Sequence, residues 1–169
     1  YSFLPEGTAY DVYGVITDHE CGTPSFDHDF IAARTENDNA SIGLTHRGRD
    51  PFNGSPWDLY VTGNDSLVLS GGTYFFTSAM LDGQATITVT GPTKIYVDGP
   101  AWFTGGGLIN ATGDPHDLII YSSGNDLTLT GGSNFYGAII APDSTVYLTG
   151  GMVAYGTIIA DFLDTEGST

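Results

Sequence analysis

The stretch Leu127-Thr-Leu-Thr-Gly-Gly-Ser-Asn-Phe-Tyr-Gly-Ala-Ile-Ile-Ala141 returns in similar form as Val146-Tyr-Leu-Thr-Gly-Gly-Met-Val-Ala-Tyr-Gly-Thr-Ile-Ile-Ala160. The two copies are offset by 19 residues, and 9 of their 15 aligned positions are identical. Self-similarity at a short, fixed period is typical of stacked supersecondary units, because one such unit cannot bury its apolar face alone. This repeat therefore predicts a fold built from stacked, similar coils.

Weaker copies extend the repeat toward the N-terminus. Residues 65–76, 85–99 and 100–109 each place a short alternating run before a Gly-Gly or Gly-Pro corner, where glycine tolerates a sharp turn. The corner glycines at 71, 91, 105, 131 and 150 are spaced by 20, 14, 26 and 19 residues. We therefore expect a period close to 20 whose phase is shifted by an insertion near residues 110–117.

In most copies, apolar residues alternate with Thr or Ser, as in a strand with one buried face. The residues expected to point inward are Leu67, Leu69, Ile87, Val89, Leu127, Leu129, Val146 and Leu148. A β-sandwich would not give near-identical copies every 19 residues, since its neighbouring strands alternate in direction. The sequence predicts an all-β protein whose residues 57–169 form a parallel β-helix, or β-solenoid, of about 19–20 residues per coil with a right-handed winding.

Residues 1–56 follow a different pattern. Residues 9–17 alternate well enough for a strand, whereas residues 32–56 are dense in Asn, Asp, Gly and Arg and are expected to form long loops. We expect this irregular segment to cover one end or flank of the solenoid, or to reach a neighbouring copy. Tyr10, Val12 and Val15 are the candidates for a strand that pairs with another subunit.

The charge of the chain excludes several partners. Twenty acidic residues stand against four basic ones, for a formal net charge of −16. Such a charge repels nucleic acid and anionic membrane surfaces and attracts cations. No apolar run approaches the roughly 20 residues needed to span a bilayer. We expect neither nucleic-acid binding nor membrane insertion by this chain.

An acidic and histidine-rich segment holds the candidate metal ligands. Asp18, Glu20, Asp27 and Asp29 offer carboxylate oxygens of the kind that Ca²⁺ binds in sets of six to eight. The intervening His19 and His28 make Zn²⁺ an alternative, although no His-Glu-x-x-His spacing is present. Because the segment also fits a polar loop without any ion, no cofactor is expected to be required, and Ca²⁺ is the candidate ion.

The repeat region offers few residues in an arrangement suited to catalysis. Its aspartates stand mostly at turns, where Asp is a common residue, and Lys94 is its only cation. No Gly-x-Ser-x-Gly elbow occurs. The chain is therefore not expected to be an enzyme.

Aromatic residues and sequons give two further expectations. Phe76, Tyr136 and Tyr155 are expected to occupy equivalent positions and to stack as a ladder, whereas outward aromatics would form a sugar-binding or subunit-packing surface. The candidate outward aromatics are Trp57, Trp102 and Tyr147. Four Asn-x-Ser/Thr sequons occur, at Asn53 and at the three positions taken as glycosylation candidates, Asn39, Asn64 and Asn110.

Three phrases carry a family resemblance: Thr93-Lys-Ile-Tyr-Val-Asp-Gly99, Asp117-Leu-Ile-Ile-Tyr121 and Phe135-Tyr-Gly-Ala-Ile-Ile-Ala-Pro-Asp-Ser-Thr-Val146. They resemble an uncharacterised β-solenoid domain of secreted and pilus-associated microbial surface proteins. They are also similar to choice-of-anchor-A adhesin domains and, more distantly, to ice-binding β-helices. The resemblance covers about residues 64–163 and implies an extracellular or cell-surface setting, with no catalytic residues to carry over.

Two hypotheses about function follow. The first is an extracellular structural or surface protein without catalysis, either a self-assembling filament subunit or adhesin-like, whose partners are copies of itself through head-to-tail stacking or strand addition. The alternative is a carbohydrate- or calcium-binding module of a surface protein, with surface glycans as partners.

Overall fold

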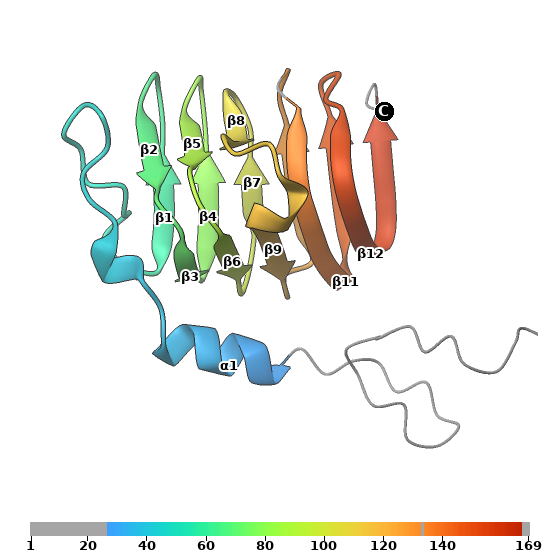
Figure 1. The fold of residues 1–169 in the computed structure, drawn as a ribbon, viewed down its shortest axis with the longest axis horizontal. Helices are drawn as coiled ribbons and strands as arrows, with labels where there is room; N and C mark the ends of the chain where they lie inside the picture. Colours follow the sequence, from blue (N-terminus) through green and yellow to red (C-terminus); the bar gives the residue numbers. More distant parts are fainter. Residues whose placement is uncertain (1–26, 133, 167–169) are drawn as a thin grey trace, which may run out of the picture.

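The computed structural model describes residues 27–132 and 134–166 of the chain. Its strands wind into a parallel β-solenoid of about five turns, which confirms the predicted fold class (Figure 1). None of the described helices has the length and apolar character that crossing a membrane would need.

Each of the first three coils places one strand on each of three faces. The first face holds β1 (Asp58–Val61), β4 (Ser78–Leu81), β7 (Ala101–Phe103) and β10 (Asp126–Thr130). The second face holds β2 (Ser66–Leu69), β5 (Thr86–Val89) and β8 (Gly107–Asn110). The third face holds β3 (Gly72–Phe76), β6 (Thr93–Val97) and β9 (Leu118–Ser122).

The last two strands are longer than the others. β11 (Phe135–Thr149) and β12 (Ala154–Glu166) each begin on the third face and continue onto the first, so that the first part of β11 pairs with β9 and its last part with β10. β12 then pairs with β11 along nearly its whole length. These two strands contain the near-identical copies in which the repeat is clearest.

The register of the strands gives the length of each coil. Leu59 pairs with Ala79, an offset of 20, whereas Ala101 pairs with Leu127, an offset of 26. The offset then returns to 19, as Leu127 pairs with Val146. The long coil contains the short 3-10 helix η2 (Pro115–Asp117), so the insertion predicted near residues 110–117 is confirmed.

The core is a set of apolar columns along the solenoid axis. All eight residues expected to point inward are buried. Aromatic side chains, including Phe76, Phe103 and Phe135, fill the space between the faces. The alternation fixes the register of each strand, because a one-residue slip would turn its apolar side chains outward.

The expected aromatic ladder is wrong for one of its three members. Phe76 points into the core, where it lies beside Val97, whereas Tyr136 and Tyr155 stack with ring centroids 4.7 Å apart and an interplanar angle of 7°. Tyr155 is exposed, so this stack lies at the surface of the third face.

The expectation of long loops over residues 32–56 is wrong in part. Helix α1 (Asp27–Thr35) runs into that segment, and η1 (Asn39–Ser41) follows it. α1 lies along the outside of the stack (Figure 1) and packs on the third face, where Phe30 meets Tyr96 edge to face at 5.2 Å. Tertiary packing, rather than helix propensity, accounts for a helix of nine residues.

The same packing covers a row of aromatic rings. Tyr96 stacks on Tyr121 with centroids 4.5 Å apart, and Trp57 meets Phe75 edge to face at 5.8 Å. Trp57 is thus half-buried in the cluster under α1 instead of forming part of an outward platform. Burial, with Tyr121 and Asp29 nearby, raises the pKa of Tyr96 to about 12.

Candidate functional site

The first coil of the solenoid is closed by residues 38–53, which we call the N-terminal cap. On the third face, the amide side chain of Asn39 behaves like a neighbouring strand toward β3. Its Oδ1 accepts from Phe75 N (3.0 Å), and its Nδ2 donates to Phe75 O (2.6 Å). Beside it, Asp38 N donates to Thr73 O (2.7 Å), and Asp38 Oδ2 accepts from Thr73 N (2.8 Å). The edge of β3 is thereby hydrogen-bonded without a further strand.

On the second face, the N-terminal cap is held by Asp65 at the start of β2. The buried carboxylate accepts from Thr45 Oγ1 (2.5 Å), Arg47 N (3.0 Å) and Ser66 N (2.9 Å). Burial opposes ionisation of Asp65, but these hydrogen bonds and the nearby Arg49 guanidinium lower its pKa below the usual value. His46 N also donates to Ser66 O (2.8 Å), so the edge of β2 is bonded as well.

On the first face, the N-terminal cap runs alongside β1. Tyr60 N donates to Pro51 O (2.7 Å), Asn53 N donates to Asp58 O (2.9 Å), and Phe52 forms an antiparallel bridge with Leu59. Every edge strand of the first coil therefore has hydrogen-bond partners in the cap.

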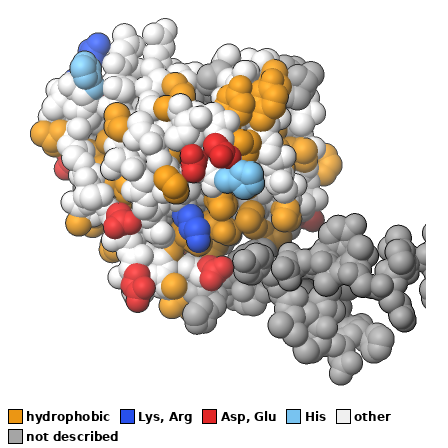
Figure 2. Space-filling view, viewed as in Figure 1, with side chains coloured by type: hydrophobic (Ala, Val, Ile, Leu, Met, Phe, Trp, Pro, Cys, Tyr) orange, Lys and Arg blue, Asp and Glu red, His pale blue; other side chains and the backbone are white. Residues whose placement is uncertain are grey.

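At the opposite end of the solenoid, the described residues provide no such cap. Within the described part of the chain, β12 pairs with β11 alone, and its outer edge carries no strand or cap. The core column shows the effect: Ala101, Leu127 and Val146 are fully buried, but Leu163, the next residue in that column, is 43% exposed. Phe162 is 60% exposed. Figure 2 shows hydrophobic side chains at the surface on this side of the stack.

The first face carries an outward row of large side chains near the cap. Tyr60, Met80 and Trp102 are in register on β1, β4 and β7, and Tyr60 and Trp102 are 37% and 39% exposed. They line a hollow of about 140 Å³ whose polar lining comes from Asn53, Asp58 and Ser78. Trp102 is thus outward, as expected from the sequence, and Tyr147, farther along the same column, also faces outward although it is half-buried.

Two of the four predicted metal ligands lie in the described part of the chain. Asp18 and Glu20 lie outside the described residues, and so do the strand candidates Tyr10, Val12 and Val15. Asp27 and Asp29 fall in the first turn of α1, where the side chain of Asp29 is exposed. Among residues 27–132 and 134–166, no three His, Cys, Asp or Glu side chains group into a metal-sized site.

The sequons differ in accessibility. Asn39 and Asn110 are buried, and the side-chain nitrogen of each donates two hydrogen bonds. A glycan on either amide would remove bonds that hold the cap or the insertion in place, so the folded structure disfavours attachment there. Asn64 is exposed and remains the accessible candidate.

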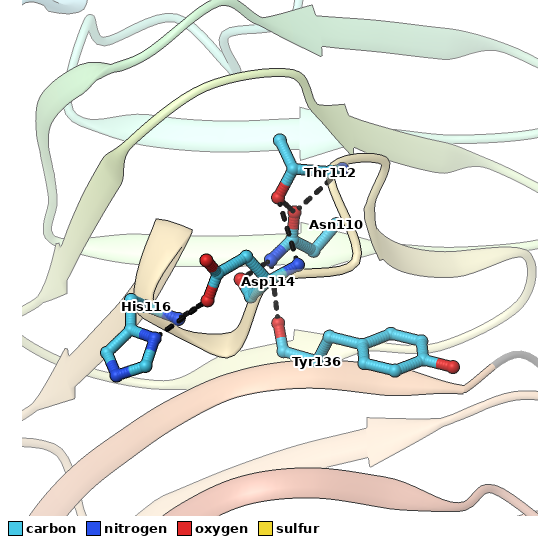
Figure 3. A network of polar contacts seen from close by, with 5 residues as sticks. All are labelled: Asn110, Thr112, Asp114, His116 and Tyr136. Carbon is cyan, nitrogen blue, oxygen red and sulfur yellow. Dashed lines mark hydrogen bonds and ion pairs between the residues drawn. The ribbon is translucent and has the colours of Figure 1, made fainter.

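Asn110 belongs to a polar network that closes the insertion (Figure 3). Its Nδ2 reaches Asp114 O (2.7 Å) and Tyr136 O (3.0 Å), so it ties the insertion to β11. Hydrogen bonds from the backbone N–H and the ring of His116 lower the pKa of Asp114. His116 and Asp114 are both exposed, and the pair shapes the start of η2.

Comparison with known proteins gives one family. A family model described as "Domain of unknown function (DUF7305)" matches residues 77–169, which include β4 through β12 and make up over half of the chain. No curated protein and no solved structure matches the chain.

Proposed function

The chain belongs to the family described as Domain of unknown function (DUF7305), and we propose that it is a non-catalytic structural subunit of an extracellular surface assembly. The observation that carries the proposal is the difference between the capped first coil and the open edge of β12. An exposed strand edge is a template for pairing with another chain. Two observations support an extracellular setting. Residues 93–99 and 117–121 resemble a domain of secreted and pilus-associated microbial surface proteins, and the sequon at Asn64 is exposed.

The contact that we propose is strand addition at β12. Head-to-tail stacking would use the edges of β1, β2 and β3, whose backbone groups already bond to the N-terminal cap. Displacing the cap would leave the Asp65 carboxylate and the Phe75 backbone without their partners, and buried polar groups without partners are costly. β12 offers an edge that needs no such displacement.

The added strand, in this proposal, is the segment 9–17 of a neighbouring copy. That segment has the alternation of a strand, and 13 residues of β12 give it enough length to pair. Tyr10, Val12 and Val15 would supply its apolar side chains. Each copy would donate at one place and accept at another, which is a heterologous contact, and such a contact yields a filament when its rotation does not close into a ring.

The proposal is tested by sedimentation velocity and electron microscopy of the purified chain over a range of concentrations. Leu163→Lys places a charge at the open end of the core, and Val12→Lys places one on the donated strand. The matched control is Val68→Lys, which adds the same charge to a residue of β2 that is 59% exposed.

We expect wild type and Val68→Lys to form filaments, and both Leu163→Lys and Val12→Lys to remain single particles. Single particles of wild type at every concentration would contradict assembly. Loss of filaments in the Leu163 variant but not in the Val12 variant would refute segment 9–17 as the added strand while retaining the β12 contact.

A further inference from the structure

The hollow on the first face has a flat apolar floor. Tyr60, Met80 and Trp102 follow one another in register on three adjacent strands, which are separated by about 4.8 Å each. Their side chains face outward, because the intervening residues, such as Leu59 and Leu81, point into the core. Two aromatic rings and a thioether therefore form a strip that remains partly open to solvent.

One polar wall of this hollow is held rigidly. Asp58 Oδ1 accepts from Thr77 Oγ1 (2.6 Å) and Ser78 Oγ (3.2 Å), which fixes the carboxylate at the start of β1. Asn53 is brought to the same place by the N-terminal cap, since its backbone N donates to Asp58 O (2.9 Å). A carboxylate and a side-chain amide thus stand beside the apolar strip.

We propose that this hollow binds one uncharged sugar ring of a glycan. A pyranose has an apolar face of C–H groups and an edge of hydroxyls, and the hollow has the same division. The C–H face would lie on Trp102 and Tyr60, and the hydroxyl edge would donate to Asp58. Hydrogen bonds to an ionised acceptor are stronger than neutral ones.

Size and charge define the class of ligand. The volume of about 140 Å³ is below the roughly 300 Å³ at which sites for drug-sized molecules begin, so a single ring is the unit that it accommodates. Among the described lining residues Asp58 is the charged one, and the chain carries a net charge of −16. Sugars with carboxylate or sulfate groups are therefore repelled.

This site is independent of the proposed assembly. It uses residues of β1, β4, β7 and the cap, and none of β12. The binding experiment is therefore done on the full chain carrying Leu163→Lys, so that failure of the sugar site and failure of the filament are separate results.

In the experiment, each probe is titrated into the protein. Binding is measured by calorimetry and by the NMR shift of the indole N–H resonance of Trp102. The probes are oligosaccharides of glucose, mannose and N-acetylglucosamine, together with oligogalacturonate as an acidic sugar and choline as an organic cation. Trp102→Ala and Asp58→Asn probe the floor and the wall. Tyr155→Ala is the control, because it removes an exposed aromatic ring from the third face.

We expect at least one uncharged oligosaccharide to saturate with a dissociation constant on the order of 1 mM and to shift the Trp102 resonance. Trp102→Ala should weaken binding about tenfold, Asp58→Asn should weaken it by a smaller factor, and Tyr155→Ala should leave it unchanged. Saturation by none of the uncharged sugars would overturn the proposal. Equal binding by Trp102→Ala, or saturation by choline or oligogalacturonate alone, would overturn it too.

Discussion

The two ends of the solenoid differ in how the edge strands are hydrogen-bonded. At the N-terminal end, side chains and loop backbone in residues 38–53 bond to the edges of β1, β2 and β3. At the other end, β12 presents an edge without such partners in the described chain, and Leu163 is left exposed in a column that is otherwise fully buried. A few well-placed polar groups can thus close a strand edge without another strand, and the difference between the two ends underlies the contact proposed at β12.

The largest effect is expected from breaking the cap at Asn39. Replacement by Leu leaves the backbone N–H and C=O of Phe75 without partners in a buried place, so the free energy of unfolding should fall by about 2–4 kcal/mol. Urea unfolding followed by circular dichroism measures this change. Asn64→Leu, at an exposed position, should change it by less than about 0.5 kcal/mol. A loss below about 1 kcal/mol in the Asn39 variant would show that the cap contributes little.

Acid should weaken the same end through Asp65. Its pKa in the folded chain is lower than the value of 3.8 expected for the unfolded chain, so its ionised form stabilises the fold above about pH 4. That stabilisation is lost as the pH falls through 3.8 toward the folded-state pKa. Urea midpoints measured from pH 7 to pH 3 should decline less steeply below pH 4 in Asp65→Asn than in wild type. Parallel declines would contradict the assigned role, and Asp143→Asn, at an exposed position in the irregular part of β11, should follow wild type.

Two tyrosine stacks differ in whether α1 covers them. Tyr96–Tyr121 and Tyr136–Tyr155 share nearly the same geometry, with centroids 4.5 and 4.7 Å apart and interplanar angles of 7°, but only the first lies in the cluster under α1. Tyr121→Ala should lower the free energy of unfolding by about 2 kcal/mol, and Tyr155→Ala by about 0.5–1 kcal/mol. Equal losses in thermal or urea unfolding would mean that α1 does not strengthen the stack that it covers.

The smallest effect is expected at Ser122. Its buried hydroxyl has no hydrogen-bond partner in the described structure, whereas the buried hydroxyl of Ser144 donates to Gly124 O. Ser122→Ala should leave the free energy of unfolding within about 0.5 kcal/mol of wild type or raise it slightly, and Ser144→Ala should lower it by about 1 kcal/mol. A loss in Ser122→Ala as large as that in Ser144→Ala would indicate a partner for Ser122, such as bound water.

The repeat made much of the fold predictable from sequence. Alternation of apolar residues with Thr assigns Leu127 and Val146 to the buried face, and the irregular glycine spacing locates the insertion of the third coil. The position of Phe76 was not predictable in this way. The residues between a glycine corner and the next inward position vary in number from coil to coil, so equivalence cannot be counted from the corner alone.

The cap and the hollow depend on contacts that occur once and therefore leave no periodic signal. Asn39 belongs to a sequon, and nothing in its neighbourhood in sequence distinguishes a buried bridge to β3 from a surface amide. Tyr60 and Met80 join Trp102 only through offsets of 20 and 22 residues, which become apparent once the strand register is known. α1 likewise gains its stability from the aromatic cluster on the third face, far away in sequence.

The most direct test of the difference between the two ends is amide hydrogen exchange at low and high protein concentration. We expect strong protection of β1, β2 and β3 at both concentrations, because the cap bonds their edges within one chain. Protection of the β12 amides that face away from β11 should be weak in the dilute chain and should rise at least about tenfold when filaments form. If β12 is equally protected at both concentrations, or stays unprotected in filaments, then its edge is not where the subunits meet.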